Sequence, residues 1–179
     1  LRPSGAAPAT VPVAPAAAPA VAPAPSRLPE VTVSASAESP SGLLPAYAGG
    51  QIARGGRVGM LGNRDVLDTP FSQTSYTAKL IEDTQARTMA DVFKNDASIV
   101  TTAPSNSGWD GSQSRGFSIG DTTDSISFNG LYGILPYYSV DVGIAERIEV
   151  FRGPSALLNG MPLSNSTGGS VDIVSKRAQ

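Results

Sequence analysis

The chain has 179 residues, 40% of them hydrophobic, and a formal net charge of −2 from 13 basic and 15 acidic residues. It contains no cysteine and no histidine. This excludes disulfides, thiolate chemistry, and histidine as a general base or a metal ligand. The basic residues form no stripe that would indicate nucleic-acid binding. The sequence contains no run of about 20 apolar residues, so no membrane-spanning helix is predicted. The length fits one domain with a tail. The absence of cysteine and histidine fits a protein that lies outside the cytoplasm and does no chemistry of its own.

The N-terminal quarter of the chain reads as three segments. Residues 1–27 are rich in Ala, Pro and Val and contain seven prolines, which predicts a disordered, extended linker. Residues 28–38 contain a short β-branched run, Val31–Val33, directly after Glu30. A strand with flexible chain on both sides is either a stray β segment or a strand offered to another protein. Residues 39–56 are rich in Gly, Pro and Ser and predict a flexible connector.

From residue 57 to residue 179 the pattern predicts a folded domain of short strands and short helices. The expected strands are 57–60, 73–76, 98–102, 114–118, 124–129, 146–152 and 170–175, and the expected helices are 78–83, 89–95 and 154–159. Thr88 and Asp91 have the spacing of a capping box, and strands 114–118 and 124–129 are expected to form a hairpin. The fold class is therefore α+β, a small mixed β-sheet with short helices, preceded by the disordered Ala/Pro-rich tail.

The stretch ERIEVFRGPSALLNG, residues 146–160, has the order strand, glycine turn, helix that phosphate-binding loops use. Pro154-Ser155 stands where such a loop has Lys-Ser or Lys-Thr, and proline lacks the N–H that a phosphate requires. We therefore interpret Gly153 as the turn, Pro154 as the first helical position and Gly160 as the helix end. A nucleotide-binding enzyme and a secreted interaction module on an Ala/Pro stalk are the competing hypotheses.

Four motifs in chain order carry a resemblance to a known family. They are Arg115-Gly116-Phe117, Asn129-Gly130, the stretch 146–160 and the terminal GGSVDIVSKRA, residues 168–178. In this order and spacing they resemble the plug domain of TonB-dependent outer-membrane receptors, in particular the ferric-siderophore type, over residues 57–179. The resemblance implies a 22-stranded barrel that is absent from this chain. The chain is then expected to be the N-terminal segment of a longer bacterial outer-membrane receptor, ending about where the first barrel strand begins.

The resemblance also implies partners for specific residues. Glu30, Val31, Thr32 and Val33 stand where the family has its TonB box, so this strand is expected to pair with the C-terminal domain of TonB in the periplasm. Arg115 and Arg152 are expected to dock the plug on carboxylates of the receptor's own barrel. A signalling domain upstream of the Ala/Pro linker is a further possible partner in some receptors.

For the cargo, the resemblance implies a ferric siderophore bound near loops that face the cell exterior. The candidate contacts, all polar or aromatic, are Trp109, Gln113, Tyr132, Tyr137 and Tyr138. Iron would travel inside the siderophore, so no cofactor or metal is expected to bind the chain directly and no catalytic residue is expected. Haem and cobalamin are the rival cargoes, and the lack of histidine argues mildly against haem.

Overall fold

The computed structural model describes residues 42–103, 107–119, 125–162 and 167–177. The predicted Ala/Pro linker and the predicted TonB box, Glu30 to Val33, lie outside the described residues. Within the described part, no helix is long and apolar enough to cross a membrane.

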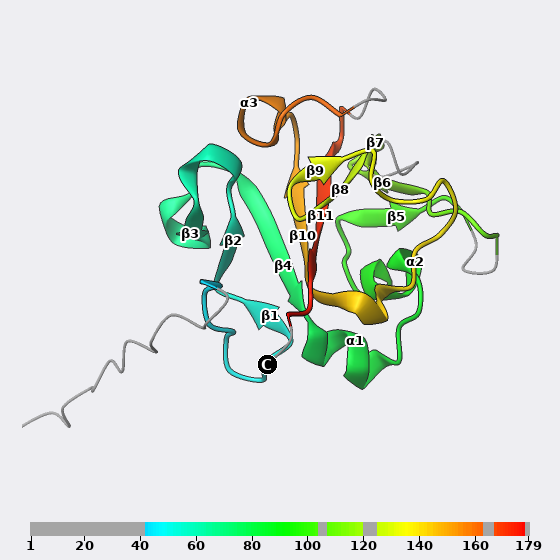
Figure 1. Ribbon diagram of the computed structural model, residues 1–179, viewed down its shortest axis with the longest axis horizontal. Helices are drawn as coiled ribbons and strands as arrows, with labels where there is room; N and C mark the ends of the chain where they lie inside the picture. Colours follow the sequence, from blue (N-terminus) through cyan, green and yellow to red (C-terminus); the bar gives the residue numbers. More distant parts are fainter. Residues whose placement is uncertain (1–41, 104–106, 120–124, 163–166, 178–179) are drawn as a thin grey trace, which may run out of the picture. The chain divides into compact units, whose positions relative to one another are not determined.

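The centre of the fold is a six-stranded sheet, in which only β8 and β11 run parallel to each other (Figure 1). Its strands, in spatial order, are β1 (Ile52–Ala53), β4 (Ser72–Thr77), β10 (Ala145–Arg152), β11 (Gly169–Ser175), β8 (Ile126–Phe128) and β9 (Leu131–Tyr132). A two-stranded sheet contains β2 (Gly55–Arg57) and β3 (Asn63–Asp65), and a three-stranded one contains β5 (Ile99–Thr101), β6 (Ser112–Ser114) and β7 (Phe117–Ile119). The α-helices are α1 (Ala78–Thr84), α2 (Met89–Phe93) and α3 (Ala156–Asn159), and the 3-10 turns are η1 (Gly59–Leu61), η2 (Val66–Asp68) and η3 (Val142–Ile144).

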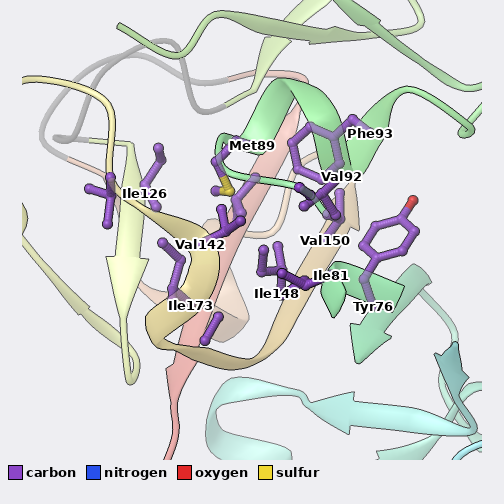
Figure 2. Close-up of a cluster of buried hydrophobic side chains, with 14 of the residues drawn as sticks. Tyr76, Ile81, Met89, Val92, Phe93, Ile126, Val142, Ile148, Val150 and Ile173 are labelled. Carbon is purple, nitrogen blue, oxygen red and sulfur yellow. The ribbon is translucent and has the colours of Figure 1, made fainter. Parts of the chain in front are cut away.

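The two faces of the main sheet differ in chemistry. Side chains alternate between the faces along a strand, so Ile148 and Val150 of β10 share one face, while Arg147, Glu149 and Phe151 share the other. The first face forms the main hydrophobic core, which Figure 2 shows between the sheet and helices α1 and α2. This core includes Tyr76, Ile81, Met89, Val92, Phe93, Ile126, Val142, Ile148, Val150, Val171 and Ile173.

The second face of the sheet is polar but still buried. Gln73, Ser75, Glu149, Ser170 and Asp172 are each less than 9% exposed there. A small apolar cluster of Val58, Phe151 and Leu158, with Phe71 packed against it, lies on the same side as Glu149. The sheet is therefore covered on both faces, which explains why long strands with charged residues are almost completely buried.

Several sequence predictions hold and others fail. The capping box is confirmed, because Thr88 caps α2 and the Thr88 backbone and Asp91 side chain complete the reciprocal bond. The helix, however, ends at Phe93 rather than near residue 95. The expected hairpin of 114–118 with 124–129 is wrong: β6 pairs with β7, and β8 pairs in parallel with β11.

Two boundaries also need correction. Residues 42–56, expected as part of a flexible connector, contain β1 and the start of β2, and Leu43 and Ala53 are each 1% exposed. The folded domain therefore begins before residue 57. Pro154 does not occupy the first helical position, because Ser155 is the N-cap of α3 and the helix begins at Ala156.

Candidate functional site

The first motif, Arg115-Gly116-Phe117, forms a tight turn at the surface. Arg115 and Gly116 connect β6 to β7 and have φ values of 52° and 84°, as a two-residue type I′ hairpin turn requires. Arginine is an unusual residue at positive φ, so the turn is held by the strand pairing on both sides. Arg115 therefore lies at the tip of the β6–β7 hairpin, where it is exposed.

The second motif, Arg152-Gly153-Pro154, lies next to the first. The N–H of Gly153, which has φ 89°, donates to the carbonyl of Gly168 at 2.8 Å, and the N–H of Gly168 donates to the carbonyl of Ser118 in β7 at 2.9 Å. A Cβ on Gly168 would lie 2.3 Å from the carbonyl oxygen of Phe117. Only glycine therefore allows this approach of the two motifs.

A shallow pocket of about 300 Å³ lies where the two motifs meet. It is lined by Ser114, Arg115, Phe117, Gly153, Pro154, Thr167 and Gly168. Phe117, at the edge of this pocket, is 59% exposed. Arg115 forms no ion pair with any described residue. The arrangement offers an apolar hollow and an exposed cation to an external partner.

Arg152, in contrast, has a carboxylate partner in this chain. Its guanidinium forms an ion pair with Asp96, and both side chains are nearly buried, 9% and 12% exposed. The Nε donates to the Ser98 hydroxyl at 2.6 Å and Nη1 donates to the Thr74 hydroxyl at 2.8 Å. Sequence reasoning missed Asp96. Docking of Arg152 on a barrel stays a prediction, and the guanidinium is satisfied without one.

Asp96 is the centre of this network. The hydroxyl of Tyr76 also donates to its Oδ2, and the Ser98 backbone and hydroxyl donate to Oδ1 at 2.8 and 2.6 Å. Desolvation opposes ionisation of Asp96, but the hydrogen bonds from Ser98 and Tyr76 and the charge of Arg152 outweigh it and lower the pKa to about 2. Burial, and then the bond to Asp96, raise the pKa of Tyr76. Asp96 is thus an ionised structural anchor.

Three of the five predicted ligand-contact residues are exposed on two adjacent loops. Tyr137 and Tyr138 are 66% and 70% exposed, with rings 5.8 Å apart at 86°, and Trp109 is 46% exposed. The N–H of Ser139 donates to the carbonyl of Gly108 at 2.9 Å, which connects the two loops. The structure therefore brings the loop of Trp109 beside the loop of the tyrosine pair.

Asp110 fastens these loops to the core, and sequence reasoning missed this residue. Burial raises the pKa of Asp110, while hydrogen bonds from the Ser139 side chain and from the backbone of Val140 and Met89 act in the opposite direction. One carboxyl thus joins the Trp109 loop, the tyrosine loop and the start of α2. The signal in the sequence was a lone acidic residue inside an otherwise neutral polar loop.

The other two predicted contacts have different surroundings. Tyr132 of β9 is half-buried, and its neighbours are Ser170 and Asp172 of β11. Gln113, in the middle of β6, is paired between Val100 and Ser118 and is partly exposed. Neither residue is part of the exposed pair of aromatic loops. Among the described residues, no group of three or more acidic side chains could hold a metal ion.

Comparisons with known proteins agree on one family. A protein-family model described as "TonB-dependent Receptor Plug Domain" matches residues 65–173. The ferrichrome receptor FcuA of Yersinia enterocolitica is 42% identical over 137 residues, 76% of this chain and 18% of the receptor. The crystal structure of BauA, the ferric preacinetobactin receptor of Acinetobacter baumannii, is 46% identical with a TM-score of 0.68, over 73% of this chain and 19% of that chain.

A transporter with a different named cargo is also similar. The vitamin B12 transporter BtuB of Vibrio vulnificus is 29% identical over 112 residues, 60% of this chain and 18% of the transporter. The chain thus spans less than a fifth of the length of each of these relatives. The family model, over residues 65–173, includes both arginine-glycine motifs.

Proposed function

Because the chain belongs to the TonB-dependent receptor plug domain family, we propose that it is the plug of a bacterial outer-membrane receptor that imports a ferric siderophore. The observation that carries the proposal is the family match across residues 65–173, which contains both motif turns and the pocket between them. The similar proteins are named as receptors and transporters, and the proposed role involves no catalysis.

A ferric siderophore is the cargo that the sequence identities to the similar receptors favour. Two of the similar siderophore receptors are 42% and 46% identical to this chain, against 29% for the vitamin B12 transporter, while a further siderophore receptor is 28% identical. The exposed aromatic loops support this choice, because rings with polar groups suit a chelate that combines apolar parts with hydrogen-bonding groups. We propose Trp109, Tyr137 and Tyr138 as contacts, with Gln113 and Tyr132 as weaker candidates.

We propose that the receptor's own barrel is the partner of the pocket between the two motifs. Arg115 is exposed and forms no ion pair with a carboxylate among the described residues, so a carboxylate of the barrel could pair with its guanidinium. Phe117 and Pro154 form an apolar edge on which a barrel side chain would pack. Arg152 would take part only indirectly, by keeping the end of β10 in place beside Gly153.

Energy would enter through the TonB box at Glu30, Val31, Thr32 and Val33. A strand with little demand on sequence is suited to edge pairing with TonB, since main-chain hydrogen bonds supply the affinity. The test is co-purification of the intact protein with the C-terminal domain of TonB. Val31→Pro should abolish it, because proline removes a ladder donor. Ala17→Pro in the Ala/Pro linker is the matched control and should bind normally; binding that survives Val31→Pro would refute the box assignment.

A further inference from the structure

The first segment that the structure describes lies against the polar face of the main sheet. We refer to residues 43–58 as the strap. Leu43 and Ala53 are 1% exposed and Val58 is fully buried. β1 within the strap pairs with β4, and the N–H of Thr77 donates to the carbonyl of Gln51 at 3.0 Å. The strap is thus part of the fold: β1 forms an edge of the main sheet, and the strap is anchored by its buried residues, although other strap residues are exposed.

Two ionisable side chains of β10 hold the strap backbone. The N–H of Arg57 donates to Oε2 of Glu149 at 2.8 Å. The guanidinium of Arg147 donates through Nη2 to the carbonyl of Leu44. A Cβ on Gly56 would lie 2.8 Å from Cδ of Glu149, so the strap approaches the carboxyl as closely as a backbone can.

This contact leaves polar atoms without partners. Oε1 of Glu149, Nη1 of Arg147 and the hydroxyl of Ser75 are buried with no hydrogen-bond partner among the described residues. An ionised carboxylate is costly in such a place, whereas a neutral carboxyl can donate its proton to a nearby oxygen. The hydroxyl of Ser75 is a neighbour of this kind, since Ser75 is directly paired with Glu149.

The charges around Glu149 come from three elements. Asp172 of β11 is its direct cross-strand partner, Arg147 lies on the same strand, and Arg57 belongs to the strap. Burial raises the pKa of Glu149 to about 7, with Asp172 acting in the same direction and the two arginines and the Arg57 N–H opposing. The carboxyl is therefore poised to change charge in a physiological range.

We propose that Glu149 and Arg147 form a proton-sensitive clasp for the strap, which is held more tightly when Glu149 is protonated. Detachment of the strap would return Glu149 to water, where a carboxyl ionises near its ordinary pKa of 4.5. The seated state then binds more protons than the detached state between about pH 4.5 and pH 7. By linkage, raising the pH across this window favours detachment, at most about tenfold per pH unit for one proton.

The clasp goes beyond the proposed import function and depends on it in one respect. If residues 30–33 are the TonB box, the strap is the first segment after it that the structure describes. Proton binding at Glu149 would then set how readily a pull on the box detaches the strap. The attachment itself is a property of the folded chain and can be measured without TonB or siderophore.

The experiment is hydrogen exchange of the intact protein, followed by mass spectrometry at pH 5.5 and pH 8 with correction for intrinsic exchange. Peptides covering the strap report the clasp, and peptides covering β10 and β11 are the internal reference. In the wild type, strap protection should fall at pH 8 by at least tenfold relative to the reference. In Glu149→Gln, which is neutral at both pH values, the difference should disappear and protection at pH 8 should rise.

Glu82→Gln, at an exposed position of α1, is the control for the change in charge and should behave as the wild type does. Strap protection in the wild type that does not change between pH 5.5 and pH 8 would overturn the clasp, even if Glu149→Gln failed to fold. A pH effect that persists in Glu149→Gln would overturn the assignment to this residue. A failure of TonB binding would leave either result intact and would instead concern the import function.

Discussion

Arg152, the last residue of β10, forms a nearly buried ion pair with Asp96, in the turn between α2 and β5. The two residues are 56 positions apart in the sequence. Their pairing joins the end of the central sheet to the smaller β5–β6–β7 sheet, which carries the Arg115 turn. The geometry of the two motif turns therefore depends on a contact inside the chain.

Removing the cation of this pair should destabilise the fold strongly. Arg152→Met leaves a buried carboxylate with only hydroxyl and backbone donors, and loss of one partner of a buried pair costs about 3–5 kcal/mol. We expect a loss of at least about 3 kcal/mol in the free energy of unfolding, measured by urea denaturation of the intact protein.

The matched control is Lys79→Met, which removes the cation of the exposed Lys79–Asp83 pair within α1. Exposed helical pairs of this spacing contribute about 0.3–0.5 kcal/mol. If the two substitutions had equal effects, the Arg152–Asp96 pair would not anchor the fold.

The acid sensitivity of the fold should depend on Asp96. Its pKa is lowered to about 2 in the folded chain from the ordinary 3.8, so its contribution is fully present above about pH 4 and is lost as the pH falls to about 2. Asp96→Asn should be less stable than the wild type at pH 6 but lose less stability between pH 4 and pH 2. Urea denaturation between pH 2 and pH 6 measures the free energy of unfolding of both proteins. If this free energy changed with pH in parallel for the wild type and Asp96→Asn, the acid sensitivity would not come from Asp96.

Elements with local signals were predictable, and contacts between distant segments were not. The expected strands 146–152 and 170–175 agree with β10 and β11 within one residue, because β-branched and other apolar residues recur along both strands. Helix α2 was found through its capping box, a contact across three residues. Asp96, by contrast, could not be assigned to Arg152, because nothing in either local pattern indicates a partner so far away.

The missed hairpin and the missed clasp have specific physical causes. The turn at Arg115-Gly116 escaped notice because arginine rarely adopts the positive φ that a type I′ turn needs. Glu149 alternates with apolar residues along β10, which is typical of a strand with one face in water. It is buried because the strap covers that face, and the strap sequence resembles a flexible connector in its composition.

The exposed cation at the tip of the β6–β7 hairpin should matter for docking and not for folding. Arg115→Asn removes the charge without strain, because asparagine adopts positive φ more readily than most residues. We expect the free energy of unfolding to change by less than about 0.5 kcal/mol. In the complete receptor, the same variant should weaken retention of the plug in the barrel, measured as increased protease cleavage of the plug.

Arg115→Lys is the control that keeps the charge but loses the planar fork, and it should give an intermediate result. Normal retention of the plug in Arg115→Asn would contradict the docking role of this residue. Reduced stability of the isolated fold in that variant would indicate a structural role instead.

The aromatic loops provide the final prediction, which concerns cargo binding by the complete receptor. Tyr137 and Tyr138 are highly exposed and form a T-shaped pair, and the Ser139–Gly108 hydrogen bond holds them beside the loop of Trp109. Replacing the pair with alanine should raise the dissociation constant for the bound siderophore by tenfold or more, as truncation of an aromatic hot spot costs about 2 kcal/mol or more. Ferrichrome is the first probe and preacinetobactin the second, each as the ferric complex, because these cargoes are named for the similar receptors.

Tyr47→Ala, at an exposed tyrosine of the strap, is the matched control and should leave the affinity unchanged. An unchanged affinity in the Tyr137–Tyr138 double variant, for a siderophore that the wild type binds, would remove these loops from the binding site.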